Sequence, residues 1–202
     1  MNRRQFIAAG GRTAASMASL ASFTVLGACT TTGPGNADAA AEKNARLRRE
    51  IDTDVDAALA RLYGTVKGSR ELVGKSSAVL VFPEVVGAAF GVGGEYGRGA
   101  LRADGRSVGY FSTTAGSFGF QIGAQSRAVF YAFMTRGALE RFKRSSGWKA
   151  GADATVALVK MGANGQIDTT TAVNPIEAFV LTNAGLMAGA SLEGTKVSRL
   201  DL

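Results

Sequence analysis

The sequence feature that most restricts the fold is a glycine-rich apolar stretch from Val81 to Gly99, which begins as a buried strand and is punctuated by Pro83. Glycine recurs in this stretch at positions 87, 91, 93, 94, 97 and 99. Because glycine inside a strand usually costs stability, such a dense run indicates bulges, tight bends or the close approach of another backbone. The same composition returns at 115–125 and 186–194. These three segments predict strongly curved antiparallel strands that close on each other.

The remaining pattern is mainly that of β-structure. Alternating residues with β-branched or aromatic side chains predict strands at 78–82, 88–96, 107–112, 117–122, 128–134, 154–159, 167–171, 178–182 and 187–192. Asp104-Gly105 and Asn164-Gly165 are the strongest hairpin turns. A helix is expected over 136–144, with Thr135 as its N-cap and Gly147 as its stop. The predicted class is α+β: a strongly curved or closed antiparallel sheet, an N-terminal amphipathic helix and few other helices.

The N-terminal helix is predicted over 42–67, because apolar residues recur there at spacings of three and four. They are Leu47, Ile51, Val55, Leu59 (or Ala58), Leu62 and Val66. One interpretation is that this apolar stripe packs on the sheet. The other is an amphipathic helix on a membrane surface, whose polar face is usually rich in Lys and Arg. Acids dilute that basic character, namely Glu50, Asp52, Asp54 and Asp56. The later basic residues fit an anionic surface better, and are Arg61, Lys67, Arg70 and Lys75.

Residues 1–28 have the pattern of an export signal, with paired arginines, a moderately apolar run and small residues before Cys29. The apolar run is too short and too weakly hydrophobic to span a membrane well. Arg3-Arg4-x-Phe6-Ile7 resembles the twin-arginine signal, although Asn2 stands where Ser or Thr is usual. Both general secretory and twin-arginine export therefore remain open.

Leu26-Gly-Ala-Cys29 resembles the bacterial lipobox, in which the cysteine carries the lipid and becomes the mature N-terminus. Cys29 is the only cysteine, which excludes an intramolecular disulfide and leaves its thiol for an acyl group such as palmitate. Thr30 follows where an inner-membrane retention signal usually has Asp, so the outer membrane, facing the periplasm, is the expected location. Residues 29–41 predict a flexible tether, and 42–202 a single domain.

Composition argues against several classes of function. The chain carries a net charge of +7, and +4 remains without the three arginines of residues 1–28. This mild charge favours anionic surfaces but is far from that of a nucleic-acid binder. The chain has no histidine, which removes the commonest general base and the usual zinc ligands. Tyr96 stands where a dinucleotide fingerprint starting at Gly91 needs its third glycine. We therefore expect a non-catalytic protein without metal or cofactor.

Two smaller features leave alternatives open. Glu95 and Glu193 each follow a glycine-rich strand, and are either rim residues of the curved sheet or a pair that contacts a ligand. Trp148, the only tryptophan, precedes Asp153 in a loop that enters a strand. This loop is either a capped turn with the indole covering the edge of the core, or a place where an aromatic ring lines a ligand.

Five ordered motifs resemble the SYLF domain family, whose members are lipid-binding modules. They are Val81–Gly97, Gly123–Arg127, Ser145–Trp148, Gly151–Ala157 and Gly185–Lys196, within a stretch from residue 45 to the C-terminus. The resemblance implies lipid binding by 42–202. Eukaryotic relatives bind phosphoinositides, and some bind or bundle actin. In animal relatives the N-terminal amphipathic region helps to contact the membrane, and it corresponds to 42–75 here.

The export signal puts an actin role in doubt, because actin is not a periplasmic partner. Phosphoinositides are uncommon bacterial lipids, so another anionic lipid is the expected ligand. The expected function is therefore a non-catalytic lipid-binding domain of a membrane-anchored bacterial lipoprotein. Its candidate headgroup-binding residues are Arg61, Lys67, Arg70 and Lys75. The alternative is a periplasmic scaffold for an envelope protein partner, held at the membrane by its acyl anchor alone.

Overall fold

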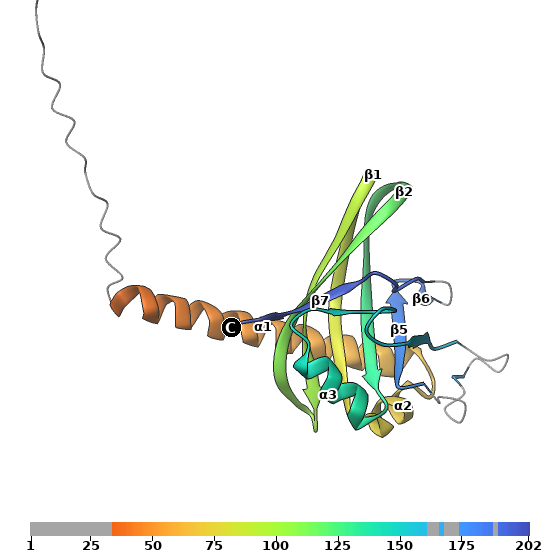
Figure 1. Ribbon diagram of the computed structural model, residues 1–202, viewed down its shortest axis with the longest axis horizontal. Helices are drawn as coiled ribbons and strands as arrows, with labels where there is room; N and C mark the ends of the chain where they lie inside the picture. The colour runs from red at the N-terminus through yellow and green to blue at the C-terminus, as the bar shows by residue number, and fades with distance from the viewer. Residues whose placement is uncertain (1–33, 161–165, 168–173, 188–189) are drawn as a thin grey trace, which may run out of the picture. The chain divides into compact units, whose positions relative to one another are not determined.

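The computed structural model describes residues 34–160, 166–167, 174–187 and 190–202, with the backbone alone at 34–36, 88–92 and 117–125 (Figure 1). The expected export signal, Cys29 and the Asn164-Gly165 turn lie outside the described residues. The described chain contains three helices and a seven-stranded sheet, which confirms the α+β class.

Helix α1 spans Pro34–Thr65 and begins eight residues before the expected start, so it includes residues assigned to the tether. Proline suits the first turn of a helix, and the alanine-rich run that follows has the highest helix propensity. The apolar stripe of α1 packs on the sheet, because Ile51, Val55, Ala58 and Leu62 are buried. This confirms the packing interpretation of the stripe.

A second helix, α2 (Ser69–Lys75), follows after one tight turn. Gly68 in that turn has a φ of 88°, a left-handed conformation that favours glycine. A Cβ atom at Gly68 would lie 2.9 Å from Cγ1 of Ile167. The buried Ser69 hydroxyl donates to the carbonyl of Val66 at 2.6 Å, which fixes α2 against the end of α1.

The sheet is built on one long antiparallel pair, β1 (Ala78–Ala103) and β2 (Arg106–Phe133). The turn between them is the predicted Asp104-Gly105, and both residues have positive φ, as two-residue hairpin turns require. Pro83 does not end β1, as its place in the sequence suggested. It lies at a register shift between Phe82 and Val85, where a bulge removes the need for its missing N–H.

Both strands of this pair bend back on themselves, so that each has two arms (Figure 1). The arms of β1 approach closely at two glycines, as the sequence predicted. A Cβ atom at Gly97 would lie 2.7 Å from the carbonyl oxygen of Glu84, and one at Gly99 would overlap that of Val81. Glycine is therefore required where β1 crosses its own first arm.

Five shorter strands complete the sheet. They are β3 (Trp148–Lys149), β4 (Val156–Leu158), β5 (Ile176–Thr182), β6 (Gly185–Leu186) and β7 (Lys196–Leu200). The order is β3–β7–β2–β5–β4, with β1 also on β2 and β6 on β5. All pairs are antiparallel except β4–β5, so the expected antiparallel sheet is mixed at one edge.

Some predicted strands differ from those observed. The prediction of a strand at 187–192 is wrong over its described residues, because Gly185–Leu186 forms β6 instead and 187 and 190–192 are irregular. Strands β3 and β7 were missed. Ile167 is the one described residue of the predicted strand at 167–171. It follows Gln166, which forms an isolated bridge with Lys67.

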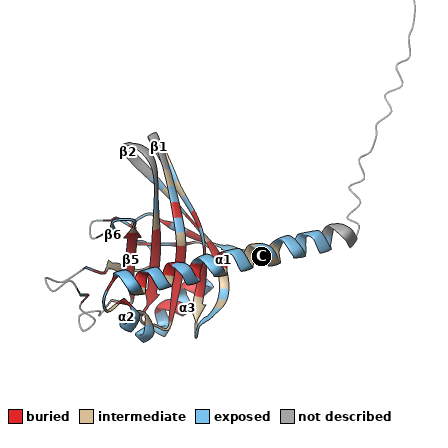
Figure 2. Cartoon of the chain, turned by 180° about the vertical axis from the view of Figure 1, so that it is seen from behind, coloured by how far each residue is buried: buried red, intermediate tan, exposed pale blue. Residues whose placement is uncertain are grey.

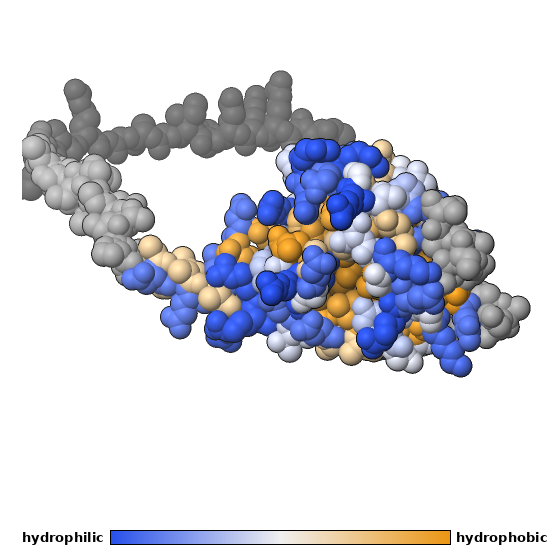
Figure 3. All heavy atoms as spheres, turned by 90° about the horizontal axis from the view of Figure 1, so that it is seen from below, coloured by the Kyte–Doolittle hydropathy of each residue, from blue (hydrophilic) through white to orange (hydrophobic). Residues whose placement is uncertain are grey.

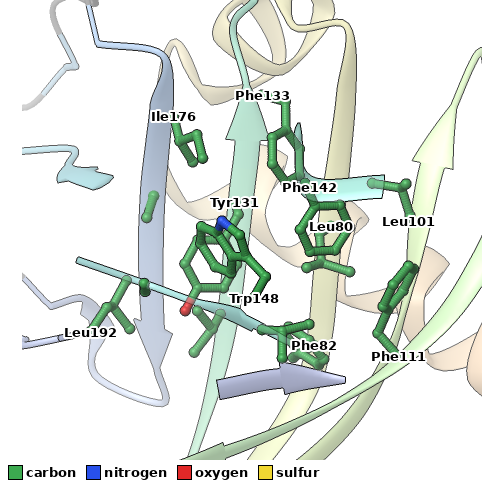
Figure 4. Close-up of a cluster of buried hydrophobic side chains, with 14 of the residues drawn as sticks. Leu80, Phe82, Leu101, Phe111, Tyr131, Phe133, Phe142, Trp148, Ile176 and Leu192 are labelled. Atoms are coloured by element: carbon green, nitrogen blue, oxygen red, sulfur yellow. The ribbon is translucent and has the colours of Figure 1, made fainter. Parts of the chain in front are cut away.

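The sheet is buried on both faces. Helix α3 (Arg136–Arg144) has the predicted bounds, and the Thr135 hydroxyl accepts from the Ala138 N–H at 3.2 Å, as expected of its N-cap. Helix α3 and β3 cover one face, seen in Figure 1, where Trp148 and Phe142 pack on the aromatic residues of β2 (Figure 4). Helices α1 and α2 cover the other face, seen from behind in Figure 2. The front layer below means α3, β3 and β7, and the back layer means α1 and α2.

Candidate functional site

A pocket of about 280 Å³ opens where α1, α2 and both ends of β1 meet, and we call it the basal pocket. Its apolar lining comes from Leu59, Tyr63, Val73, Ala78, Val79 and Ala103. It lies at the end of the sheet that carries α2 and the Asp104-Gly105 turn. Seen from that end, apolar side chains are visible between hydrophilic ones (Figure 3). The pocket can therefore receive an apolar group at a polar rim.

Helix α2 carries two of the predicted cations, of which Arg70 contacts a residue that lines the pocket. The Arg70 guanidinium lies 4.3 Å from the centroid of the Tyr63 ring, a cation–π contact with a ring that lines the pocket. Burial raises the pKa of the Tyr63 hydroxyl, and Arg70 partly offsets this effect. Lys75 lies between two lining residues, Gly74 and Ser76, and its Nζ is 2.7 Å from Oε1 of Glu71.

Arg102 forms the opposite wall and joins the sheet to α1. Its guanidinium donates to Oδ1 of Asp56 at 2.6 Å and to the backbone carbonyl of Asp52 at 3.1 Å. The carboxylate of Asp52 accepts from Ser107 at 2.6 Å and from Tyr110 at 2.9 Å. Burial, and then the hydrogen bond to Asp52, raise the pKa of Tyr110.

These contacts change the interpretation of the acids on α1. Asp52 and Asp56 are held by the sheet, and Glu50 lies 3.7 Å from Arg98. Three of the four acids that dilute the basic character of α1 in the sequence are therefore compensated within the fold. Their charge opposes an anionic partner less than the sequence alone indicated.

None of the four predicted cations lines the basal pocket, and Arg70 contacts its lining residue Tyr63. Arg61 is exposed on α1 and lines a different groove, of about 440 Å³, with Asp54 and Glu84. Lys67 is exposed beyond the end of α1, and its backbone carbonyl accepts from the Ile167 N–H at 3.2 Å. Neither lines the basal pocket.

Sequence reasoning missed Tyr63 and Arg102. Tyr63 lies at the edge of the apolar stripe of α1, at spacings of four from Leu59 and three from Val66, so the helical period could have included it. Arg102 had no such signal. Its role depends on the end of β1 returning to α1, which no local pattern shows.

The sequence left two features open, each as either a structural feature or a ligand contact. The structure favours the structural alternative for both. Glu95 forms an ion pair with Arg127 at 2.5 Å across β1 and β2, whereas Glu193 lies against Gly151. Trp148 is buried, with its ring centroid 5.5 Å from that of Tyr131, and Oδ2 of Asp153 accepts from the Lys149 N–H at 2.6 Å. Both features are explained by packing and capping.

Within the described part of the chain, no group of three His, Cys, Asp or Glu side chains is placed to hold a metal ion. Nor does any helix there have the length and apolar character needed to cross a membrane. The basal pocket combines an apolar lining and an aromatic ring with three charged residues, Asp56, Arg102 and Asp104.

Fold and pocket thus define a domain suited to binding. Residues 114–201 match the family model Ysc84, described as Las17-binding protein actin regulator. This match confirms the resemblance to the SYLF family over these residues, and that family is one of lipid-binding and actin-regulating domains rather than of enzymes. No curated protein matches the chain. The helices and strand that build the basal pocket precede the matched residues.

Proposed function

We propose that the protein is a non-catalytic lipid-binding domain of a membrane-anchored bacterial lipoprotein, and that it recognises anionic headgroups at the envelope membrane. The observation that carries the proposal is the basal pocket, whose apolar lining lies beside Arg102 and whose Tyr63 ring is covered by the Arg70 guanidinium. A lipid presents the complementary chemistry, because its phosphate is anionic and its acyl region is apolar.

Binding a phosphate would break little that already stabilises the fold. The pair between Lys75 and Glu71 is exposed on both sides, and such i,i+4 pairs contribute about 0.3–0.5 kcal/mol. Lys75 can therefore leave Glu71 for a headgroup. The contact with Tyr63 orders Arg70 over that ring before any ligand arrives, which reduces the entropy lost on binding.

Membrane residence comes from Cys29 in this proposal. Two or more acyl chains on one residue hold a protein firmly, whereas one chain gives marginal binding. We place the anchored protein at the outer membrane, facing the periplasm, because Thr30 follows the cysteine. The actin regulation named in the family description does not suit that compartment.

A second candidate is a scaffold for an envelope protein. Val86 and Tyr96 are 43% and 52% exposed on the arms of β1, and both line a groove of about 200 Å³ with Glu50, Asp54 and Glu84. Exposed apolar residues with a polar rim mark protein contacts. This candidate predicts indifference to lipid.

The test is co-sedimentation of residues 30–202, without the anchor, with neutral and anionic vesicles at low and high salt. Each cation near an anionic surface contributes about 1 kcal/mol, so reversing two with Arg70→Glu/Lys75→Glu should weaken binding at least about tenfold. Arg61→Glu/Lys67→Glu is the matched control, with the same charge change on α1 and two residues beyond its end, outside the pocket.

Salt-sensitive binding that is lost in the pocket variant and largely kept in the control supports the proposal. Equal losses would mean a diffuse electrostatic attraction without a role for the pocket. If the unaltered protein binds neither kind of vesicle, the domain does not recognise lipid and the scaffold is favoured.

A further inference from the structure

The front layer carries a second group of basic residues on the face of the sheet opposite to α1 and α2. They are Arg141, Lys143 and Arg144 of α3, Lys149 of β3, and Lys196 and Arg199 of β7, and all six are exposed. We call them the front cationic face. None of them was among the lipid-binding candidates from the sequence, because they lie in separate segments.

Packing joins the three elements into one surface. Phe142 of α3 lies 5.7 Å from the ring of Trp148 in β3. Strand β3 pairs with β7, so that Lys149 lies directly opposite Lys196. A Cβ atom at Gly147, in the loop after α3, would lie 3.3 Å from Cε of Lys196. Lys149 and Lys196 thus lie side by side next to the loop after α3, whereas Arg199 points to the other face of β7.

The charge of this face is compensated in part, by Glu140 on α3 and by Asp153, whose carboxylate accepts from the Lys149 N–H at 2.6 Å. Within α3, Lys143 lies 3.5 Å from Glu140, and both side chains are about half exposed. The cations in the last turn of α3 are explained in part by the helix dipole, which favours positive charge there. The helix dipole does not explain Lys149 and Lys196, which belong to strands. They lie directly opposite each other, and like charges in that position are destabilising. A bound anion would relieve their repulsion.

The two basic surfaces are separated by the sheet. The front layer packs on one buried cluster, which includes Tyr131 and Phe142, and the back layer packs on another, which includes Leu62 and Phe130. Figures 1 and 2 show the two layers from opposite sides. A bilayer in contact with the basal pocket at α2 therefore leaves Lys149 and Lys196 accessible to something else.

The character of the front face favours a lipid surface as its partner. Large exposed apolar side chains in the described residues are Val86, Tyr96, Val108 and Met187, and none belongs to α3, β3 or β7. Protein interfaces usually have an apolar core, which this face lacks. Anionic bilayers attract dispersed cations through their surface potential alone.

We propose that the front cationic face binds a second anionic bilayer while the basal pocket holds the first, so that one molecule bridges two membranes. This inference rests on the proposed function of the pocket. It goes beyond that function because it adds a second site and a consequence, the clustering of vesicles.

The experiment measures light scattering and co-sedimentation in parallel, with residues 30–202 and vesicles of phosphatidylcholine with or without an equal part of phosphatidylglycerol. Residues 34–202 form one compact unit, so the protein without its anchor keeps both surfaces. The front variant is Lys149→Glu/Lys196→Glu. It replaces two facing positive charges with two facing negative ones, so the pair across β3 and β7 still carries like charges. Arg61→Glu/Lys67→Glu again matches the change in net charge, and urea unfolding checks that each variant is folded.

The unaltered protein should cluster anionic vesicles and leave neutral ones dispersed. The front variant should lose the rise in scattering while its co-sedimentation falls by less than about threefold, because the basal pocket remains. The charge-matched control should keep both.

Three results overturn the inference while leaving the proposed function intact. They are co-sedimentation of the unaltered protein without clustering, clustering by the front variant at the unaltered level, and equal loss of clustering in front variant and control. Loss of both readouts in the front variant alone would show that both faces contact one bilayer. Failure of the unaltered protein to co-sediment is the different outcome that removes the proposed function itself.

Discussion

Single residues decide where this sheet can bend. Gly99 lies where the second arm of β1 crosses the first, against the carbonyl of Val81. The backbone oxygen cannot move aside as a side chain can, so a methyl group here requires the two arms to separate. The constraint at Gly99 is one of space, since its φ is not positive.

The substitution Gly99→Ala should therefore lower the free energy of unfolding by more than about 2 kcal/mol, the range of severe overpacking. Urea denaturation measures it. Gly116→Ala is the control, because a Cβ atom there meets nothing within 4 Å. Equal effects of the two substitutions would show that the close approach at Gly99 is not a constraint.

Asp52 links α1 to the sheet through hydroxyls of Ser107 and Tyr110. In Asp52→Ala both donors lose their acceptor in a partly buried place, which should cost about 1–3 kcal/mol. Asp54→Ala removes an exposed carboxylate two residues away and should stay within about 0.5 kcal/mol of the unaltered protein. Urea midpoints of the two variants compare these values, and similar losses would contradict the assigned role of Asp52.

Tyr131 makes the stability of the domain sensitive to alkali. Burial raises the pKa of its hydroxyl far above the usual value. The folded state therefore keeps a proton that the unfolded chain loses above pH of about 10, so stability is full below that pH and falls as pH rises further. The urea midpoint should stay level up to about pH 9 and fall above about pH 10, and it should fall less in Tyr131→Phe. An equal fall in both proteins would assign the effect to other groups.

Among the elements, those with local signals were predicted well. Helix α3 has an N-cap, an apolar face of Leu139 and Phe142 and a following glycine, and its bounds were correct. The Asp104-Gly105 turn was likewise correct. The start of α1 was placed too late because the alanine-rich segment lacks large apolar residues, although alanine itself favours helix.

Elements that depend on distant partners were not predicted. Strand β7 has one fully buried residue, Val197, and its pairing with Tyr110–Thr114 cannot be seen from its own residues. Strand β1 was divided at Pro83, because a bulge that accommodates proline has no sequence signal of its own. For the same reason none of the four candidate cations lines the pocket, and Arg102, which does, was missed.

The cap of α3 offers a test at this scale. Thr135→Ala removes the acceptor for the Ala138 N–H and should cost about 1 kcal/mol, whereas Thr135→Ser should cost much less. Because α3 covers the aromatic cluster of Phe142 and Trp148, near-ultraviolet circular dichroism should report any loosening. Equal stabilities of the alanine and serine variants would rule out a stabilising cap.

At the scale of the whole molecule, the residues that match the family model are not the same as the residues that form the folded unit. The match begins at Thr114, inside β2, whereas the sheet requires β1 along the entire length of β2. The second arm of β2 also depends on the back layer, because Phe130 and Ala132 are buried in the cluster that includes Ile51, Val55 and Leu62 of α1. A chain of residues 114–201 would expose that face and leave one edge of β2 unpaired.

We therefore predict that residues 114–201 alone do not fold cooperatively, whereas residues 34–202 do. The shorter chain should show no sigmoidal urea transition and should bind a dye for exposed apolar surface, because half of its core lacks a covering layer. Adding residues 34–113 as a separate chain should restore the transition if β1 and α1 supply what is missing. A cooperative transition of residues 114–201 alone would show that α3 and the front layer suffice, and that the back layer, with its basal pocket, is an addition to the fold rather than part of its core.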